Sequence, residues 1–137
     1  MLSRGDYHWQ HEPALYVIRK GRTGHWQGAR DQSTVWTIDA SGLENLATVH
    51  GTQKPVECMR RPMLNSSGRG DTVYEPFGGS GSTIIAAETV ARRAYAMELS
   101  ESYCDLIVRR WQGFTGREAT HQQTGRTFAE ESLRRIA

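Results

Sequence analysis

A chain of 137 residues is long enough for one ordinary domain and too short for two. Apolar residues make up 37% and charged residues 23%, a composition that excludes a disordered tail. No apolar run has the length of a membrane-spanning helix, and the N-terminus has no signal-peptide pattern. Cys58 and Cys104 lie far apart and form no CxxC pair, which excludes a disulfide scaffold and a zinc ribbon. We expect a soluble, cytoplasmic protein.

The charge is balanced overall but uneven along the chain. The net charge of +2 comes from 17 basic and 15 acidic residues and does not by itself indicate a nucleic-acid partner. Between Arg4 and Arg30, however, five basic residues stand against Asp6 and Glu12. A solvated basic loop is the ordinary interpretation of such a stretch.

The N-terminal part predicts two short strands separated by a loop. Residues 14–18 (ALYVI) form an apolar run of aromatic and β-branched residues, which is typical of a buried strand. Residues 21–33 contain three glycines among polar residues and predict the loop. Residues 34–38 (TVWTI) predict the second strand.

The middle of the chain predicts a helix and then a strand followed by a glycine-rich loop. The helix is expected over 56–64, and a turn cluster over 65–71 separates it from a strand over 72–77. Residues 78–81 (GGSG) form the glycine-rich loop, and Ser82 is the expected N-cap of the next helix.

A second strand is expected over 94–99, and Ser100 is the expected cap of a helix with an apolar stripe of Tyr103, Leu106, Ile107 and Trp111. This order of elements is a βαβ unit, which implies parallel strands and a right-handed crossover. The capping-box pattern at 127–130 (TFAE) predicts a short helix within a tail over 113–137.

The glycine-rich loop carries the strongest indication of function, because such a loop lets a ligand approach the backbone closely. A nucleoside triphosphate site would need the lysine of a GK[ST] ending, which this loop lacks. A dinucleotide site would need G-x-G-x-x-G, and Ile84 occupies the third glycine position. Glu75, before the loop, would repel a pyrophosphate and suits a ligand with a cationic amino group.

Glu98, at the expected end of the next strand, is the second indication. An acidic side chain at this place accepts hydrogen bonds from both ribose hydroxyls of a nucleoside ligand. A ribose with a cationic amino acid and no phosphate describes S-adenosyl-L-methionine. The alternative is that Glu75 and Glu98 are ordinary exposed acids.

Two motifs and Glu98 occur in a specific order and spacing. The motifs are Thr52-Gln53-Lys54-Pro55 and residues 71–83 (DTVYEPFGGSGST). In this arrangement the chain resembles, over residues 11–116, the DNA methyltransferases that modify adenine N6 or cytosine N4. The resemblance implies an α/β, Rossmann-like methyltransferase fold in incomplete form, S-adenosyl-L-methionine as cofactor and double-stranded DNA as partner. It corresponds to the C-terminal part of such an enzyme, with the cofactor region over 50–112.

The resemblance also implies which residues bind the cofactor: Thr52, Gln53, Lys54, Glu75, Pro76, Phe77, Gly79, Ser80, Gly81, Ser82, Thr83 and Glu98. Thr52, Gln53 and Lys54 would hold its methionine end, with Lys54 as the partner of its carboxylate. The alternative for Lys54 is an exposed loop lysine. The family usually has aspartate where this chain has Glu75, which places the carboxylate one methylene further out.

The family's catalytic motif is an Asp-, Asn- or Ser-Pro-Pro-aromatic loop that binds the target amino group and stacks on the flipped base. None of the four prolines of this chain is adjacent to another. We therefore expect no catalytic residue in this chain and no methyl transfer by it alone. We expect either a homodimer or a separate chain that carries the catalytic motif.

Residues 19–33 fall where the family carries variable DNA-contacting sequence. Basic side chains there would meet phosphates, and an aromatic ring would stack on a base. The expected DNA-binding residues are Arg19, Lys20, Arg22, Trp26 and Arg30, and a solvated loop is the alternative. The histidines near the N-terminus lack metal-ligand spacing, so we expect no metal.

Two other functions remain open at this point. One is a non-catalytic DNA- or protein-binding remnant of the methyltransferase fold. The other is a small nucleotide-binding enzyme of another kind, which the composition of the glycine-rich loop disfavours.

Overall fold

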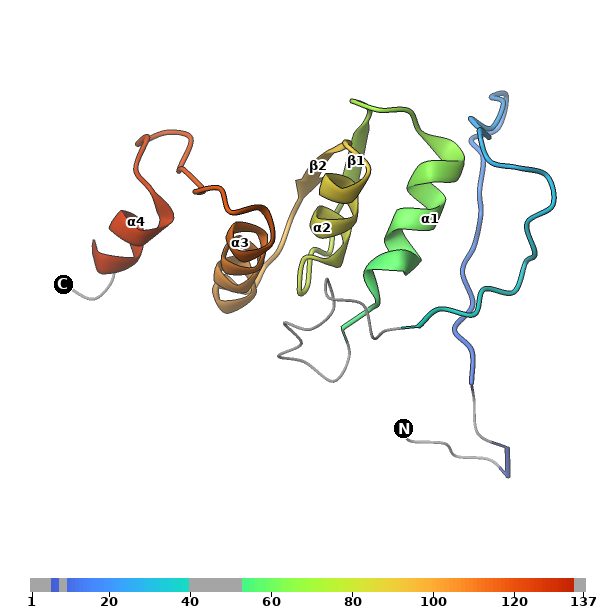
Figure 1. Cartoon of the computed structure of the whole chain (residues 1–137), viewed down its shortest axis with the longest axis horizontal. Helices are drawn as coiled ribbons and strands as arrows, with labels where there is room; N and C mark the ends of the chain where they lie inside the picture. Colours follow the sequence, from blue (N-terminus) through green and yellow to red (C-terminus); the bar gives the residue numbers. More distant parts are fainter. Residues whose placement is uncertain (1–5, 8–9, 40–52, 135–137) are drawn as a thin grey trace.

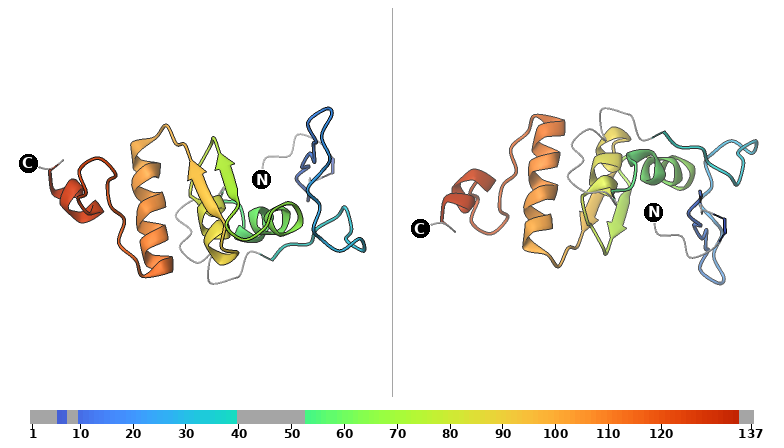
Figure 2. Two further views of the ribbon diagram at one scale, coloured as in Figure 1. Left: turned by 90° about the horizontal axis from the view of Figure 1, so that it is seen from above. Right: turned by 90° about the horizontal axis from the view of Figure 1, so that it is seen from below.

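The computed structural model describes residues 6–7, 10–39 and 53–134. Its helices and strands are, in chain order, α1 (Val56–Ser66), β1 (Thr72–Glu75), α2 (Ser82–Thr89), β2 (Arg93–Ala96), α3 (Glu101–Thr115) and α4 (Phe128–Arg134) (Figure 1). The segment 10–39 lies beside α1, at the end of the molecule opposite α4 (Figures 1 and 2). None of the described helices is both long and apolar enough to span a membrane.

The two strands and α2 form the predicted βαβ unit, which the structure confirms. β1 and β2 pair in parallel, with Thr72 opposite Arg93 and Glu75 opposite Ala96. Both strands are shorter than expected, because the regular pairing ends after Glu75: the Phe77 N–H donates to the Glu75 carboxylate, and the Met97 carbonyl accepts from the Gly78 N–H instead. The prediction that Glu98 ends the second strand is therefore wrong. Glu98 lies two residues after Ala96, the last residue of β2.

Helices cover one face of this sheet. Figure 2 shows α1 and α2 on the same side of the strands. On that side, Val73 and Ala94 pack against a core of Val56, Met63, Ile85, Ala86, Ala87 and Val90. On the other side, the register partners Tyr74 and Tyr95 are 62% and 59% exposed. The helices thus bury one face and leave an aromatic face open to solvent.

The prediction of two strands in the N-terminal segment is wrong, since residues 14–18 and 34–38 have no strand structure. Leu15, expected to be buried, is 91% exposed. A strand needs a neighbouring strand for its backbone hydrogen bonds, and the described part of the chain places none beside these residues. The loop expected over 21–33 is confirmed.

The helix starts and ends differ from expectation in two places. α1 continues past Pro62 to Ser66, two residues beyond the predicted end. The N-cap of α2 is Gly81, in the left-handed conformation with φ +83°, and Ser82 is the first helical residue. The Ser82 hydroxyl instead donates a hydrogen bond to the carbonyl oxygen of Lys54 at 2.7 Å.

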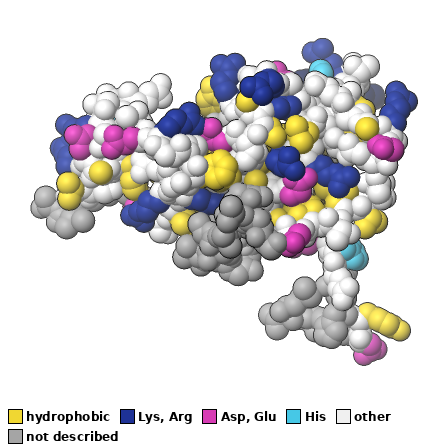
Figure 3. Space-filling view, in the orientation of Figure 1, with side chains coloured by type: hydrophobic (Ala, Val, Ile, Leu, Met, Phe, Trp, Pro, Cys, Tyr) yellow, Lys and Arg dark blue, Asp and Glu magenta, His cyan; other side chains and the backbone are white. Residues whose placement is uncertain are grey.

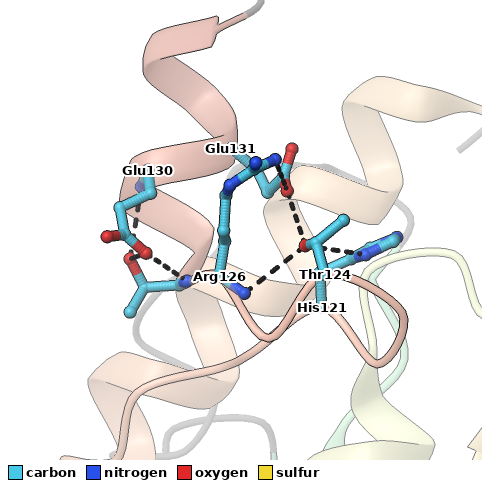
Figure 4. Close-up of polar contacts among 6 residues, drawn as sticks. His121, Thr124, Arg126, Glu130 and Glu131 are labelled. Atoms are coloured by element: carbon cyan, nitrogen blue, oxygen red, sulfur yellow. Dashed lines mark hydrogen bonds and ion pairs between the residues drawn. The ribbon is translucent and has the colours of Figure 1, made fainter.

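The tail contains the predicted short helix, α4, which begins at a capping box (Figure 4). The Glu130 N–H donates to the Thr127 hydroxyl at 3.2 Å, and the Thr127 N–H donates to the Glu130 carboxylate at 2.7 Å. This reciprocal pair satisfies backbone donors that the first turn leaves open. The turn before α4 is tied to it by Thr124, whose hydroxyl donates to Glu131 at 2.7 Å (Figure 4).

Candidate functional site

A cavity of about 170 Å³ lies where β1 passes into the glycine-rich loop. It is lined by Gln53, Lys54, Met59, Glu75, Phe77, Gly78, Gly79, Ser80, Ser82, Thr83 and Tyr103. The fold therefore brings residues 53–54 together with residues 75–83, which the sequence separates by a helix and a turn. The carboxyl ends of parallel strands are the usual ligand-binding edge of α/β folds.

Glu75, the last residue of β1, lies half-buried in the wall of this cavity. One carboxylate oxygen accepts a hydrogen bond from the Phe77 N–H and the other from the Thr83 hydroxyl, each at 2.9 Å. Each oxygen keeps a lone pair for a further donor. Glu75 thus orders the turn after β1 and presents a fixed negative charge to the cavity.

Lys54, on the segment before α1, contributes a positive charge to the same cavity. Its Nζ forms an ion pair with Glu12, with both carboxylate oxygens at 2.7 Å. The two side chains are 47% and 72% exposed, respectively. Lys54 is therefore half-exposed, as an ordinary loop lysine would be, but it is paired and lines the cavity.

The glycine-rich loop needs its glycines because α3 and β2 lie close against it. A Cβ on Gly81 would lie 3.2 Å from Ile107 Cγ1, and the backbone there has a left-handed φ. A Cβ on Gly78 would lie 3.1 Å from Ile107 Cδ1 and 3.2 Å from the Met97 carbonyl oxygen. An added Cβ at either place would require Ile107 to shift, so the loop backbone lies in close contact with α3 and with the residue after β2.

Glu98 is not among the residues that line the cavity. Its carboxylate accepts hydrogen bonds from the Ser100 N–H at 2.9 Å and the Gly79 N–H at 2.7 Å. These backbone donors, at Ser100 and at Gly79, hold the pKa of Glu98 below its ordinary value. In this structure Glu98 joins the glycine-rich loop to the start of α3, and its role toward a ribose stays a prediction.

Arg110 of α3 is the main residue that the sequence reasoning missed. Its side chain is buried, with 7% exposed, and its Nη1 donates to the Ser80 carbonyl oxygen at 3.0 Å and to the Ser82 hydroxyl at 3.2 Å. Burial lowers the pKa of this guanidinium. One feature of the sequence indicates a buried role for Arg110: it lies on the same helix face as Tyr103 and Ile107, where apolar residues are expected.

The other expected cofactor residues are placed as follows. Gln53, Gly79 and Ser80 line the cavity, as do Ser82 and Thr83, which are buried. Gly81 is not among the lining residues. Pro76 and Phe77 are exposed, and Phe77 also contributes to the cavity wall. Thr52 lies outside the described residues. Met59 and Tyr103, which line the cavity as well, were not predicted as site residues.

The residues expected to contact DNA all lie on an exposed part of the segment 10–39: Arg19, Lys20, Arg22, Trp26 and Arg30. Figure 3 shows Lys and Arg side chains over the region where this segment and α1 lie. The segment is attached to α1 at Asn65. The Asn65 carbonyl accepts from the Gln27 N–H at 2.7 Å, and its side-chain amide exchanges two hydrogen bonds with that of Gln32, at 2.7 and 2.8 Å.

Within the described residues, no group of three or more His, Cys, Asp or Glu side chains lies close enough together to hold a metal ion. The His121 ring lies 3.2 Å from the Thr124 hydroxyl on the turn before α4 (Figure 4), and His121 does not line the cavity.

The family model of the N6/N4 type, described as DNA methylase, matches residues 7–109, and the chain belongs to this family. The chain is 33% identical over 89 residues to the type II methyltransferase M2.MboI of Moraxella bovis. It is 34% identical over 86 residues to the type II methyltransferase M.Cfr9I of Citrobacter freundii. These matches cover 64% and 63% of this chain but only 33% and 28% of the two relatives.

A solved structure, the M1.HpyAVI–SAM complex, superposes with a TM-score of 0.57 at 25% sequence identity. The superposition covers 67% of this chain and 46% of that one. The fold is therefore the α/β, Rossmann-like fold of the S-adenosylmethionine-dependent DNA methyltransferases, in incomplete form. The chain spans about a third of the length of the curated relatives that it matches.

Proposed function

We propose that this chain is the S-adenosylmethionine-binding part of a site-specific DNA methyltransferase, which methylates an exocyclic amine of adenine or cytosine. Residues 50–112 form the cofactor region, residues 19–33 a DNA-contacting loop, and residues 113–137 a tail. The observation that carries the proposal is the cavity at the glycine-rich loop, with Lys54 and Glu75 in its wall.

The charges around the cavity fit the amino-acid end of this cofactor. Lys54 is the only lysine or arginine among the described residues that line it, and Glu75 is the only acid. A zwitterionic amino acid places one carboxylate and one ammonium in such a site, each near its opposite charge. A pyrophosphate would bring two or more negative charges to one lysine and a carboxylate, which disfavours a nucleotide phosphate ligand.

The loop and its neighbours hold the cofactor, while S-adenosylmethionine supplies the methyl group when bound. In this proposal Gln53, Lys54 and Glu75 bind the methionine end. Glu98 accepts from the ribose and keeps its bonds to the Gly79 and Ser100 amides, which pre-orders the loop. Arg110 supports the loop from α3, through its hydrogen bonds to the Ser80 carbonyl oxygen and the Ser82 hydroxyl.

The target amine is bound by residues outside this sequence. The chain has no Pro-Pro-aromatic motif, and β1 and β2 are the only two strands that pair in the described residues. The free edge of β1 and the face with Tyr74 and Tyr95 suit a further strand and its helices. We infer that a polypeptide with the catalytic loop docks there, in the same protein or a separate chain.

DNA is the proposed substrate, and the exposed basic segment is its proposed contact. Arg19, Lys20, Arg22 and Arg30 would meet phosphates, which predicts binding that weakens steeply with salt. This segment is attached to α1 by the amide pair of Gln32 and Asn65.

Calorimetric titration with S-adenosylmethionine and with NAD tests the cofactor assignment. We expect S-adenosylmethionine to bind and NAD to show no heat. Lys54→Met should weaken S-adenosylmethionine by about tenfold, the cost of one charged contact, and the matched change Lys20→Met should leave it unchanged. Salt-dependent DNA binding with no affinity for S-adenosylmethionine would instead favour a non-catalytic remnant.

Methyl transfer from labelled S-adenosylmethionine to duplex DNA tests the missing catalytic part. Residues 1–137 alone should incorporate no label even when the cofactor is bound. Label incorporated by this polypeptide alone would overturn the assignment of the catalytic residues to another segment.

A further inference from the structure

Lys54 is held by contacts of both its backbone and its side chain. Its backbone carbonyl accepts the Ser82 hydroxyl at 2.7 Å, which joins it to the start of α2. Its side-chain Nζ contacts both carboxylate oxygens of Glu12 at 2.7 Å. Glu12 lies 42 residues earlier in the chain and does not line the cavity itself. A residue of the N-terminal segment thus sets where the ammonium group of a cavity residue lies.

The contact matters because a free lysine side chain is poorly placed to bind a ligand. Its four-carbon stem carries about 2 kcal/mol of rotamer entropy, much of which is lost when it is fixed on binding. An ammonium group has three N–H donors, so two contacts with one carboxylate leave a donor for a ligand. Glu12 therefore orders the side chain in advance and keeps part of its binding capacity.

We propose that Glu12 is a positioning residue of the cofactor site, which acts through Lys54 on the carboxylate of the ligand. This inference rests on the proposed function, since it assumes that Lys54 binds the carboxylate of S-adenosylmethionine. Glu12 makes no contact with the cofactor in this arrangement. Its effect is confined to ligands that carry the carboxylate.

The opposite arrangement is competition, in which Glu12 occupies Lys54 and the ligand carboxylate must displace it. Two carboxylates on one ammonium repel each other, so removal of the Glu12 charge would then tighten binding. Positioning and competition predict changes of opposite sign in the affinity of the same variant.

The test compares Glu12→Gln with the unaltered chain for two ligands. One is S-adenosylmethionine, and the other is 5′-methylthioadenosine, which has the nucleoside but lacks the amino-acid end. We expect Glu12→Gln to weaken S-adenosylmethionine by about two- to fivefold, the range of an exposed charge pair, and to leave 5′-methylthioadenosine unchanged. Glu57→Gln is the matched control, because Glu57 lies near Lys54 in sequence but pairs with Arg60 at 2.6 Å.

A double-mutant cycle shows whether Glu12 acts through Lys54. In a Lys54→Met background, Glu12→Gln should cause no further loss of S-adenosylmethionine affinity. The inference would be overturned by tighter binding in Glu12→Gln, by equal weakening of both ligands, or by an undiminished loss in the Lys54→Met background. If the unaltered chain binds neither ligand, the proposed function itself fails; if it binds both and Glu12→Gln changes neither, only the role of Glu12 fails.

Discussion

Arg110 and Ser82 lie on different helices and meet beneath the glycine-rich loop, where Arg110 Nη1 donates to the Ser82 hydroxyl at 3.2 Å. The same hydroxyl donates onward to the Lys54 carbonyl at 2.7 Å. One short network therefore joins α3, the start of α2 and the segment before α1. Each of these parts contributes to the cavity lining: Tyr103 lies on α3, Ser82 and Thr83 begin α2, and Gln53 and Lys54 precede α1.

The first prediction concerns this network. Arg110→Met keeps most of the side-chain volume but leaves the Ser80 carbonyl and the Ser82 hydroxyl without their charged donor. We expect the free energy of unfolding to fall by about 2 kcal/mol, the value of a buried hydrogen bond to a charged group. Urea unfolding measures this loss. The neighbouring Arg109→Met is the control and should stay within about 0.5 kcal/mol, because Arg109 is exposed. Equal losses for both variants would show that the hydrogen bonds of Arg110 to Ser80 and Ser82 do not stabilise the fold.

The second prediction concerns the pH dependence that Glu98 contributes. Its pKa in the folded chain is depressed below the ordinary 4.5 by the Ser100 and Gly79 amides. Its stabilising contribution is therefore complete above the unfolded pKa and is lost as the pH falls through the folded pKa. Glu98→Gln should unfold at lower urea than the unaltered chain at pH 7, and the two should converge as the pH falls below about 4.5. A difference that stays constant with pH would contradict the role of the carboxylate charge.

The βαβ unit, its glycine-rich loop and α4 could be predicted because their signals are local. Glycines mark the loop, Glu75 ends β1, and the Thr127–Glu130 capping box lies within one helical turn. The N-terminal strands were predicted from equally good local patterns, but a strand also needs a partner, and the described structure has none beside residues 14–18. A local sequence pattern does not show whether a partner strand lies beside the segment.

The polar network could not be predicted for a related reason. Nothing in the sequence near Arg110 says that its partners are Ser80 and Ser82, 28 to 30 residues earlier. The contacts of Glu98 with the Gly79 and Ser100 amides likewise depend on how the chain turns after β2. Such contacts depend on the fold, and the types of the residues involved do not predict them.

The third prediction concerns the attachment of the basic segment to α1. A Cβ on Gly28 would lie 2.4 Å from Asn65 Oδ1 and 2.8 Å from Gln32 Nε2, so Gly28→Ala should break the amide pair. We expect trypsin to cleave after Arg30 about fivefold faster, as the loss of about 1 kcal/mol of hydrogen bonding would allow. Gly113→Ala is the control, since its Cβ would meet nothing within 4 Å. Unchanged cleavage in Gly28→Ala would show that the segment is held by other contacts.

The fourth prediction concerns the open face of the sheet. Tyr74 and Tyr95 face solvent, and the Tyr74 hydroxyl contacts the exposed Met97. Exposed apolar faces and strand edges associate readily with partners. We expect residues 1–137 on their own to self-associate with rising concentration in sedimentation velocity experiments. Tyr95→Lys should shift the chain toward monomer, because it places a charge at the centre of the face. A chain that stays monomeric at all concentrations would contradict the role assigned to this face.

Binding of S-adenosylmethionine at the glycine-rich loop can be observed at the amide groups of the loop glycines. In a nitrogen–proton NMR titration with S-adenosylmethionine, we expect the amide signals of Gly78, Gly79 and Gly81 to move together with that of Lys54. The signals of Gly113, Gly116 and Gly125, which lie away from the cavity, should stay in place. An absence of any shift, or shifts confined to residues 10–39, would contradict the claim.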